Sequence, residues 1–210
     1  MRRYDVLIAG IGGQGVITLG TLLKLAAIRQ GVDVTGAERR GGAQREGPVT
    51  SNVRYRVLSP EERQDPRKRP FSGLIPRGGA HMLISLEPVE AVRCLPYLNR
   101  NTVVITETRA RTPTAVRLGA AAYPPLDRVL EILREVTPRV YPVAMERVSA
   151  ERFGSLRPVN VIALGLAASL GDLPVGDEAL LATVEERLPD FPTNERAFRL
   201  GQELAGESAG

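Results

Sequence analysis

The chain has 210 residues, of which 43% are hydrophobic, and its 28 basic and 24 acidic residues give a formal net charge of +4. This composition suits an α/β domain with a hydrophobic core, and so mild a charge without a basic stripe argues against nucleic acid and favours acidic protein surfaces as partners. With one cysteine and one histidine, the chain cannot build a disulfide, a zinc site or an iron–sulfur site from its own ligands.

The longest apolar stretch runs from Val159 to Leu170. It falls short of the ~20 residues that a membrane span needs. The first residues also lack the apolar segment and cleavage site of a signal peptide. We therefore expect a cytoplasmic protein that does not contact a membrane.

The first predicted strand leads into a glycine motif. Residues 6–9 (VLIA) are a short run of strand formers, which is typical of a central strand covered on both faces. Gly10, Gly12 and Gly15 follow with the spacing G-x-G-x-x-G, and apolar residues at 16–26 recur at helical spacing. The pattern predicts a strand-to-helix turn whose helix N-terminus can hold a phosphate group.

A second strand is predicted at residues 32–37, and Glu38 closes it. In a dinucleotide-binding domain an acid near this position holds the ribose hydroxyls; alternatively, Glu38 pairs with Arg39 and Arg40. Residues 39–48 (RRGGAQREGP) are rich in arginine and glycine, which predicts a loop at the carboxyl end of the strand. In an open α/β sheet this end is the ligand-binding edge.

Residues 49–57 alternate between apolar and polar side chains, which indicates a half-exposed strand suited to antiparallel pairing. Residues 58–79 have no apolar period and predict a long loop or lid, either solvated or used for docking. The remaining patterns predict strands at 81–86, 102–106, 118–123 and 140–143, helices at 88–98, 125–135, 160–170, 177–188 and 194–204, and a frayed tail at 206–210.

The repeated strand–helix–strand order predicts an α/β fold. We expect a Rossmann-like, doubly wound, mainly parallel sheet flanked by helices, in a single domain at residues 1–205 that ends in C-terminal helices. The third strand is the expected irregularity. The helix at 160–170 is apolar on nearly all sides, so it should pack against the sheet or against another chain, and a homodimer could cover it when the chain is isolated.

Four motifs occur in order along the chain. They are GIGGQGV at 10–16, ERRGGAQREGPVTSNVRY at 38–55, SGLIPRGGA at 72–80 and LEPVEAVR at 86–93, and NERAF at 194–198 extends the likeness toward the carboxyl end. Together they resemble the gamma-type subunits of 2-oxoacid:ferredoxin oxidoreductases, and within them the small subunit of the indolepyruvate type. The likeness spans nearly the whole chain and is more specific than the glycine spacing alone.

The resemblance implies a complex that decarboxylates a 2-oxoacid, such as indolepyruvate, on thiamine diphosphate. Electrons then pass through iron–sulfur clusters to ferredoxin, and an acyl-CoA forms. It also implies that thiamine diphosphate and the clusters belong to large partner subunits on which this chain docks. The chain would bind no cofactor firmly alone and be inactive alone, with a contact to coenzyme A as a further expectation.

Carried onto this sequence, the resemblance implies a cofactor-binding or active-site-facing loop, with no catalytic residue and no metal ligand in the chain. Its residues are Gly10, Gly12, Gly13, Gln14, Gly15, Glu38, Gln44, Arg45 and Gly47. Gln14 either donates its amide to a ligand or caps the helix. Arg45 either binds a phosphate or partner carboxylate or pairs with a nearby acid. Glu46 and His81 depart from the family pattern, which bears on the identity of the 2-oxoacid.

The rival hypothesis is a free-standing Rossmann NAD(P)-binding oxidoreductase or nucleotide-binding module that uses the same glycine loop with Glu38. His81 is interpreted as a strand-edge residue, and Cys94 as an inert core thiol. The two hypotheses agree on the fold and on the ligand-binding edge of the sheet. They differ in whether the glycine loop faces a private nucleotide or a neighbouring subunit.

Overall fold

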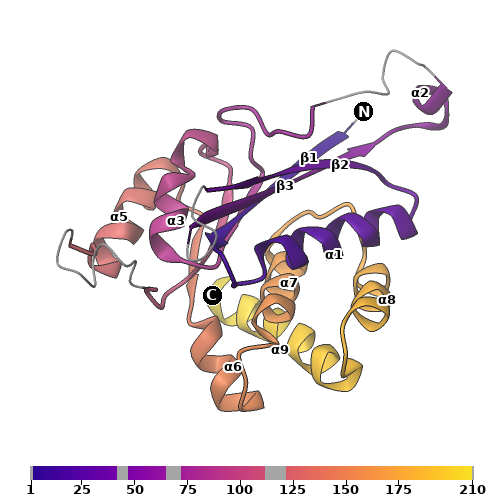
Figure 1. Cartoon of the computed structure of the whole chain (residues 1–210). Coiled ribbons are helices and arrows are strands. Elements are labelled where there is room, and N and C mark those ends of the chain that lie inside the picture. The colour runs from indigo at the N-terminus through magenta and orange to yellow at the C-terminus, as the bar shows by residue number, and fades with distance from the viewer. Residues whose placement is uncertain (1, 42–46, 65–71, 112–121, 210) are drawn as a thin grey trace.

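The computed structural model describes residues 2–41, 47–64, 72–111 and 122–209. In this part of the chain a six-stranded sheet has the order β2-β3-β1-β4-β5-β6 and carries helices on both faces (Figure 1). The strands are β1 (Arg2–Ile11), β2 (Asp33–Arg40), β3 (Pro48–Val57), β4 (Met82–Ser85), β5 (Val103–Glu107) and β6 (Val140–Val143). The helices are α1 (Val16–Arg29), α2 (Pro60–Gln64), α3 (Pro88–Arg93), the 3-10 turn η2 (Leu95–Tyr97), α5 (Leu126–Val136), α6 (Met145–Phe153), α7 (Val159–Leu170), α8 (Asp177–Arg187) and α9 (Phe191–Ala209).

The sheet is mainly parallel, with one antiparallel insertion. Strands β1, β4, β5 and β6 pair in parallel, whereas β3 lies antiparallel between β1 and β2. Val6 in the middle of β1 faces Val53 of β3 on one side and Met82 of β4 on the other. The predicted Rossmann-like sheet and its irregular third strand are therefore confirmed.

Two helical layers bury the sheet. Helices α1, α7, α8 and α9 cover one face, and α3 and α5 cover the other (Figure 1). The alternation of β1 assigns Val6 and Ile8 to the first hydrophobic cluster and Leu7 and Ala9 to the second, as expected for a strand covered on both sides. The apolar helix α7 packs against α9 and the sheet, so the intramolecular packing expected for residues 160–170 is confirmed. The homodimer remains a prediction.

Several segments differ from the patterns read in the sequence. Of the strand predicted at 118–123, residues 118–121 lie outside the described part, and Ala122 and Tyr123 are not in a strand. Helix α6 was not predicted, because its buried face includes Glu146 and Ser149 and so lacks an apolar period. Helix α9 continues to Ala209, so helix covers most of the residues predicted as a frayed tail.

Of the predicted loop at 58–79, residues 65–71 lie outside the described part, residues 60–64 form α2, and residues 72–75 lie against the sheet. The Arg54 guanidinium donates hydrogen bonds to the carbonyls of Ser72 (2.7 Å) and Leu74 (2.9 Å). The alternation at residues 49–57 indicated a half-exposed strand, and this was wrong for its polar face, because the Arg54 side chain on that face is 7% exposed. Residues 72–75 bury that face, and Asp5 of β1 supplies a carboxylate to the arginine.

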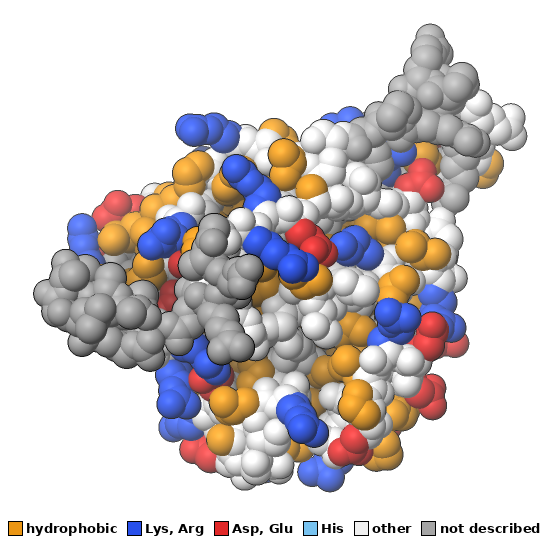
Figure 2. Space-filling view, in the orientation of Figure 1, with side chains coloured by type: hydrophobic (Ala, Val, Ile, Leu, Met, Phe, Trp, Pro, Cys, Tyr) orange, Lys and Arg blue, Asp and Glu red, His pale blue; other side chains and the backbone are white. Residues whose placement is uncertain are grey.

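In the described part of the chain, no helix has the length and apolar character needed to cross a membrane. Figure 2 shows arginine and lysine side chains scattered over one face of the molecule, many of them next to acidic or apolar side chains. Among the described residues on this face, the basic side chains do not form the regular stripe that is typical of nucleic-acid-binding domains (Figure 2).

Candidate functional site at the carboxyl edge of the sheet

The predicted glycine loop lies at the carboxyl edge of the sheet. Strand β1 ends at Ile11, and its neighbour β3 begins at Pro48 on the same edge, because the two strands are antiparallel. The Gly12 N–H donates a hydrogen bond to the Gly47 carbonyl (2.9 Å), which joins the glycine loop to the end of the arginine–glycine segment. Because β1 and β4 are parallel, the end of β4 reaches this edge as well. It is the edge at which open α/β sheets bind ligands.

The glycines of the loop differ in how much space surrounds them. A Cβ on Gly10 would lie 2.9 Å from both Gln14 Oε1 and Val16 Cγ2, so the turn is too tight for a side chain there. Gly15 has φ +81° and caps α1, and a Cβ on it would lie 2.0 Å from Asn160 Nδ2. Gly13 has φ +95° but faces open space. Gly10 and Gly15 thus shape the turn, while Gly13 exposes its backbone to whatever approaches the edge.

Gln14 connects the ends of two parallel strands. Its Oε1 accepts a hydrogen bond from the Ile11 N–H (2.8 Å), and its Nε2 donates to the Leu86 carbonyl (2.6 Å). The Ile11 contact lies three residues back in the loop, whereas Leu86 follows β4. The amide is therefore engaged on both sides within the protein, and Gln14 holds the glycine loop against the end of β4.

Replacing Gln14 with alanine is expected to lower the free energy of unfolding by about 2 kcal/mol, because two hydrogen bonds are lost and the Ile11 N–H loses its partner. Gln30→Ala is a matched control. The amide of Gln30 also makes two backbone contacts, to Pro174 and Gly176, but at an exposed loop, so its loss should cost less than about 1 kcal/mol. Denaturant unfolding measures both variants, and equal costs would contradict the bracing role.

A groove of about 690 Å³ lies beside the glycine loop. It is lined by the loop, by the first residues of α1 and by Arg40, Gly41, Gly47 and Val49 at the ends of β2 and β3. The first N–H groups of a helix have no partners within the helix, and its dipole makes this end positive. With the exposed Gly13 backbone and the Arg40 guanidinium beside it, the groove suits an anionic group.

Glu38 lies away from the glycine loop. It is paired in register with Ser51 of β3, and Ser51 with Ile8 of β1, so Glu38 is level with the middle of β1 and two strands away from it. Its carboxylate lies 3.4 Å from Lys24 Nζ and 3.8 Å from Arg40 Nη2. In a Rossmann nucleotide site the acidic residue follows a strand next to the glycine loop. Here β3 intervenes, and Glu38 forms ion pairs on the α1 side of the sheet.

The predicted site residues Gln44 and Arg45 lie outside the described residues, as does Glu46. Gly47 is described, and its carbonyl accepts the bond from Gly12. The structure therefore brings together Gly10, Gly12, Gly13, Gln14, Gly15 and Gly47 and places Glu38 apart from them. The assignment of these residues to a ligand remains a proposal.

Three buried carboxylates at the same edge were missed in the sequence. Glu87 follows β4 and accepts hydrogen bonds from the Glu90 N–H (3.0 Å) and the Tyr123 hydroxyl. Glu107 ends β5, and its Oε2 accepts from the Glu146 N–H (2.8 Å). Glu146 in turn accepts a hydrogen bond from Arg111 Nη2 (2.7 Å). An acid directly after each of two predicted parallel strands was the available signal, because such residues meet at one edge.

One of these carboxylates, Glu146, adjoins the glycine loop. Glu146 and Arg111 line a hollow of about 270 Å³ together with Gly13, Gly15 and Asn160. Burial raises the pKa of Glu107, and the negative charge of Glu146 adds to this, although three backbone N–H donors act in the opposite direction. Burial and the hydrogen bond to Glu87 raise the pKa of Tyr123, which keeps this hydroxyl protonated. The network thus combines carboxylates with donors that orient them.

The raised pKa of Glu107 predicts a pH dependence. A carboxyl group whose folded-state pKa lies above its unfolded value contributes most stability at low pH, and this contribution is lost as pH rises through the folded pKa. The unfolding free energy of the wild type, relative to Glu107→Gln, should therefore fall as the pH rises above about 4, the ordinary pKa of a glutamate side chain. Denaturant unfolding at a series of pH values measures the difference. A difference that grows with pH would mean that the N–H donors outweigh burial.

Known proteins of one family are similar to this chain over nearly its whole length. A model of the family described as "Pyruvate ferredoxin/flavodoxin oxidoreductase" matches residues 5–204. The chain is 38% identical to indolepyruvate oxidoreductase subunit IorB of Archaeoglobus fulgidus, covering 97% of this chain and 96% of that protein. It is 31% identical to the subunit of the same name from Thermococcus kodakarensis, covering 100% of both.

Solved structures have the same fold. The gamma subunit of a keto/oxoacid ferredoxin oxidoreductase from Geobacter sulfurreducens PCA superposes with a TM-score of 0.70 at 19% identity, covering 99% of each chain. A 2-oxoglutarate:ferredoxin oxidoreductase from Magnetococcus marinus, solved with 2-oxoglutarate, coenzyme A and succinyl-CoA bound, superposes with a TM-score of 0.70 at 16% identity. The match covers 99% of this chain and 32% of that longer one. At these identities the likeness concerns the fold alone.

Proposed function

The chain belongs to the pyruvate ferredoxin/flavodoxin oxidoreductase family, and from this premise we propose that it is the small subunit of a complex that oxidatively decarboxylates an aryl pyruvate such as indolepyruvate. The observation that carries the substrate class is the full-length likeness to indolepyruvate oxidoreductase subunits, at 38% and 31% identity in two species. The reaction of the complex yields an acyl-CoA and reduced ferredoxin.

We place thiamine diphosphate and the iron–sulfur clusters on larger partner subunits. A cluster is held by cysteine thiolates, usually four of them, and this chain has one cysteine. Cys94 is 2% exposed in the core beneath α3, and burial raises the pKa of its thiol to about 12. The residues of this chain therefore do not fit an iron–sulfur cluster. In this proposal the chain alone oxidises no 2-oxoacid.

The groove at the glycine loop is the proposed contact with coenzyme A. Its residues fit phosphate groups, because the N-terminus of α1, the open Gly13 backbone and Arg40 all face it. When bound, coenzyme A supplies the thiol that accepts the acyl group. In this arrangement the chain binds and orients the phosphate end, and its glycine loop faces the active site of the neighbouring subunit and helps to exclude water from it.

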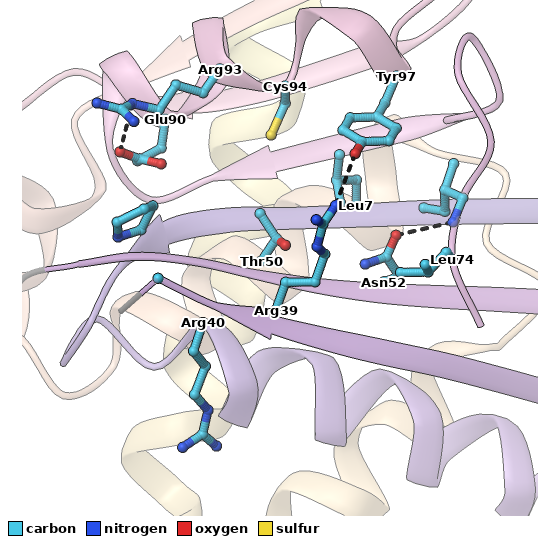
Figure 3. Close-up of a pocket in the computed structure, with 13 residues that line it drawn as sticks. Leu7, Arg39, Arg40, Thr50, Asn52, Leu74, Glu90, Arg93, Cys94 and Tyr97 are labelled. Atoms are coloured by element: carbon cyan, nitrogen blue, oxygen red, sulfur yellow. Dashed lines mark hydrogen bonds and ion pairs between the residues drawn. The ribbon is translucent and has the colours of Figure 1, made fainter. Parts of the chain in front are cut away.

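Coenzyme A binding by the assembled complex tests this contact. Arg40→Gln should raise the Kd for coenzyme A about tenfold, as expected for the loss of a charge-assisted hydrogen bond. Arg39→Gln is the matched control and should leave the Kd for coenzyme A unchanged. Arg39 lies opposite Thr50 in the register of β2 and β3, and its side chain extends from the other face of these strands than that of Arg40 (Figure 3). Equal effects of the two variants on the Kd would contradict the contact between the groove and coenzyme A. Micromolar binding of NAD(H) or NADP(H) by the chain would favour the rival nucleotide-binding function.

A further inference from the structure

A second hollow lies on the opposite face of the sheet from the glycine groove. It has a volume of about 310 Å³ and is enclosed by β2 and β3, the segment at residues 74–75 and the turn from α3 to η2 (Figure 3). Its wall therefore comes from elements that are far apart in the sequence. A water molecule occupies about 30 Å³ in the liquid, so the hollow has room for roughly ten non-hydrogen atoms.

The floor of the hollow is apolar and buried. Leu7 of β1 is 1% exposed, Ile75 is 3% exposed and Cys94 is 2% exposed. Asn52 lies beside them, but its amide is engaged within the protein. It donates to the Ala37 carbonyl (3.1 Å) and accepts from the Ile75 N–H (3.1 Å). The floor thus offers apolar contact without a hydrogen-bonding group that a ligand would have to satisfy.

Hydrogen-bond donors gather at one end. Arg39 and Thr50 are direct cross-strand neighbours, and the Arg39 guanidinium extends across the hollow until Nη1 lies 3.5 Å from the Tyr97 hydroxyl (Figure 3). The Thr50 hydroxyl has no hydrogen-bond partner in the described part of the chain. Because the tyrosine oxygen accepts from Arg39, its own hydrogen remains available as a donor.

Arg39 also differs from its neighbours in charge pairing. Arg40 lies 3.8 Å from the Glu38 carboxylate, and Arg54 lies 2.9 Å from that of Asp5. Arg39 has no acidic partner among the described residues. No acidic side chain in the described part of the chain neutralises the positive charge over the hollow, and an anionic group is the natural complement.

The other end of the hollow holds an acidic and a basic side chain that pair with each other. The Glu90 carboxyl, 8% exposed, lies 3.3 Å from Arg93 Nε, and burial raises the pKa of Glu90. Figure 3 shows this pair at the far side of the hollow from the Arg39–Tyr97 contact. The hollow thus has one cationic, donor-rich end and an apolar floor between that end and the Glu90–Arg93 pair.

We propose that this hollow binds a small monocarboxylic acid with an apolar body, such as an aryl acetate. The carboxylate is held by the guanidinium of Arg39 and by the hydroxyls of Thr50 and Tyr97, and the apolar body lies over Leu7 and Ile75. One guanidinium with two hydroxyls matches a single carboxylate. A predominantly apolar wall with a few placed donors is the usual form of a small-molecule site. This site and the coenzyme A groove adjoin at Arg40 and Gly41, which line both, but the donors Arg39, Thr50 and Tyr97 line only this hollow.

Phenylacetate is the probe, titrated into the full chain at neutral pH and followed by NMR shifts of backbone amides. We expect saturable binding with a Kd of about 1 mM or tighter, with shifts centred on Thr50, Ile75 and Tyr97. Phenylacetamide, which has the same shape without the charge, should bind at least about tenfold more weakly. Acetate, which lacks the apolar body, should bind more weakly as well.

Paired variants complete the test. Arg39→Gln should weaken phenylacetate binding at least about tenfold. Arg40→Gln should leave it unchanged, because Arg40 borders the hollow but its side chain extends away from it, toward the other face of the sheet (Figure 3). Tyr97→Phe should weaken binding without altering the fold, which circular dichroism checks. The proposal is overturned if phenylacetate does not saturate, if the amide binds as well as the acid, or if the two arginine variants behave alike. None of these outcomes bears on the coenzyme A contact, which depends on Arg40.

Discussion

Replacing Arg54 with methionine is expected to lower the free energy of unfolding by about 3–5 kcal/mol. Arg54 Nε and Nη2 lie 2.9 and 3.1 Å from the two carboxylate oxygens of Asp5, and the two side chains are 7% and 5% exposed. Without the guanidinium, the Asp5 charge stays buried without its partner, and the carbonyls of Ser72 and Leu74 lose their donor. Denaturant unfolding monitored by circular dichroism measures the loss.

The matched control for this substitution is Arg29→Met. Arg29 also pairs with a distant acid, Glu186, but the two side chains are 44% and 58% exposed. Exposed ion pairs contribute little because water screens them, so the control should cost less than about 1 kcal/mol. If both variants lost less than that, the buried pair would not be holding residues 72–75 against the sheet.

Gly201→Ala is expected to lower the free energy of unfolding by about 2–3 kcal/mol, although alanine favours helices over glycine. Helices α7 and α9 cross with their backbones in contact. A Cβ on Gly201 would lie 2.2 Å from the Ile162 carbonyl oxygen, and a Cβ on Gly165 would lie 2.1 Å from that of Phe198. Since these neighbours are backbone atoms, the helices must move apart to admit even a methyl group.

Gly206→Ala is the control within the same helix. No atom lies within 4 Å of a Cβ at Gly206, so the change should raise stability by about 0.5–1 kcal/mol through helix propensity alone. Opposite signs at the two positions are the signature of a close helix crossing. A stabilising effect at Gly201 would contradict the observed packing of α7 on α9.

Much of this fold could be predicted because it depends on local patterns. The apolar run at residues 6–9, the glycine turn and the helical period after it lie close together in the sequence, and the structure has them as β1 and α1. The alternation at 49–57 likewise predicts β3. Such patterns do not give the order of the strands in the sheet. The insertion of β3 between β1 and β2 therefore could not be predicted from them.

The parts that failed depend on distant partners. The alternation of β3 indicated a half-exposed strand, but Arg54 is buried because Asp5 and the carbonyls at 72 and 74 surround it. Gln14 looked like a helix cap or a ligand donor, yet its amide reaches Leu86, 72 residues away. Helix α6 buries Glu146 to complete a network with Arg111. Hydrophobic periodicity carries no information about such polar pairs.

The candidate site was predicted in part. The glycine motif and the carboxyl edge agree with the groove beside Gly13, whereas Glu38 pairs with Lys24 at the level of mid-strand. A ribose contact by Glu38 required β2 to lie beside β1, and the antiparallel insertion prevents that. The inserted strand β3 also supplies Thr50 and Asn52 to the second hollow, so the same topological feature disfavours a nucleotide pocket and contributes to that hollow.

The measurement that tests the central claim most directly is subunit recombination. The native complex is purified, its subunits are separated, and indolepyruvate-dependent reduction of ferredoxin is assayed with coenzyme A for each subunit and for the mixture. The proposed function predicts activity for the recombined subunits and none for this chain alone, because one cysteine cannot hold a cluster. Oxidation of a 2-oxoacid by this chain alone, or full activity of the larger subunits without it, would contradict the account.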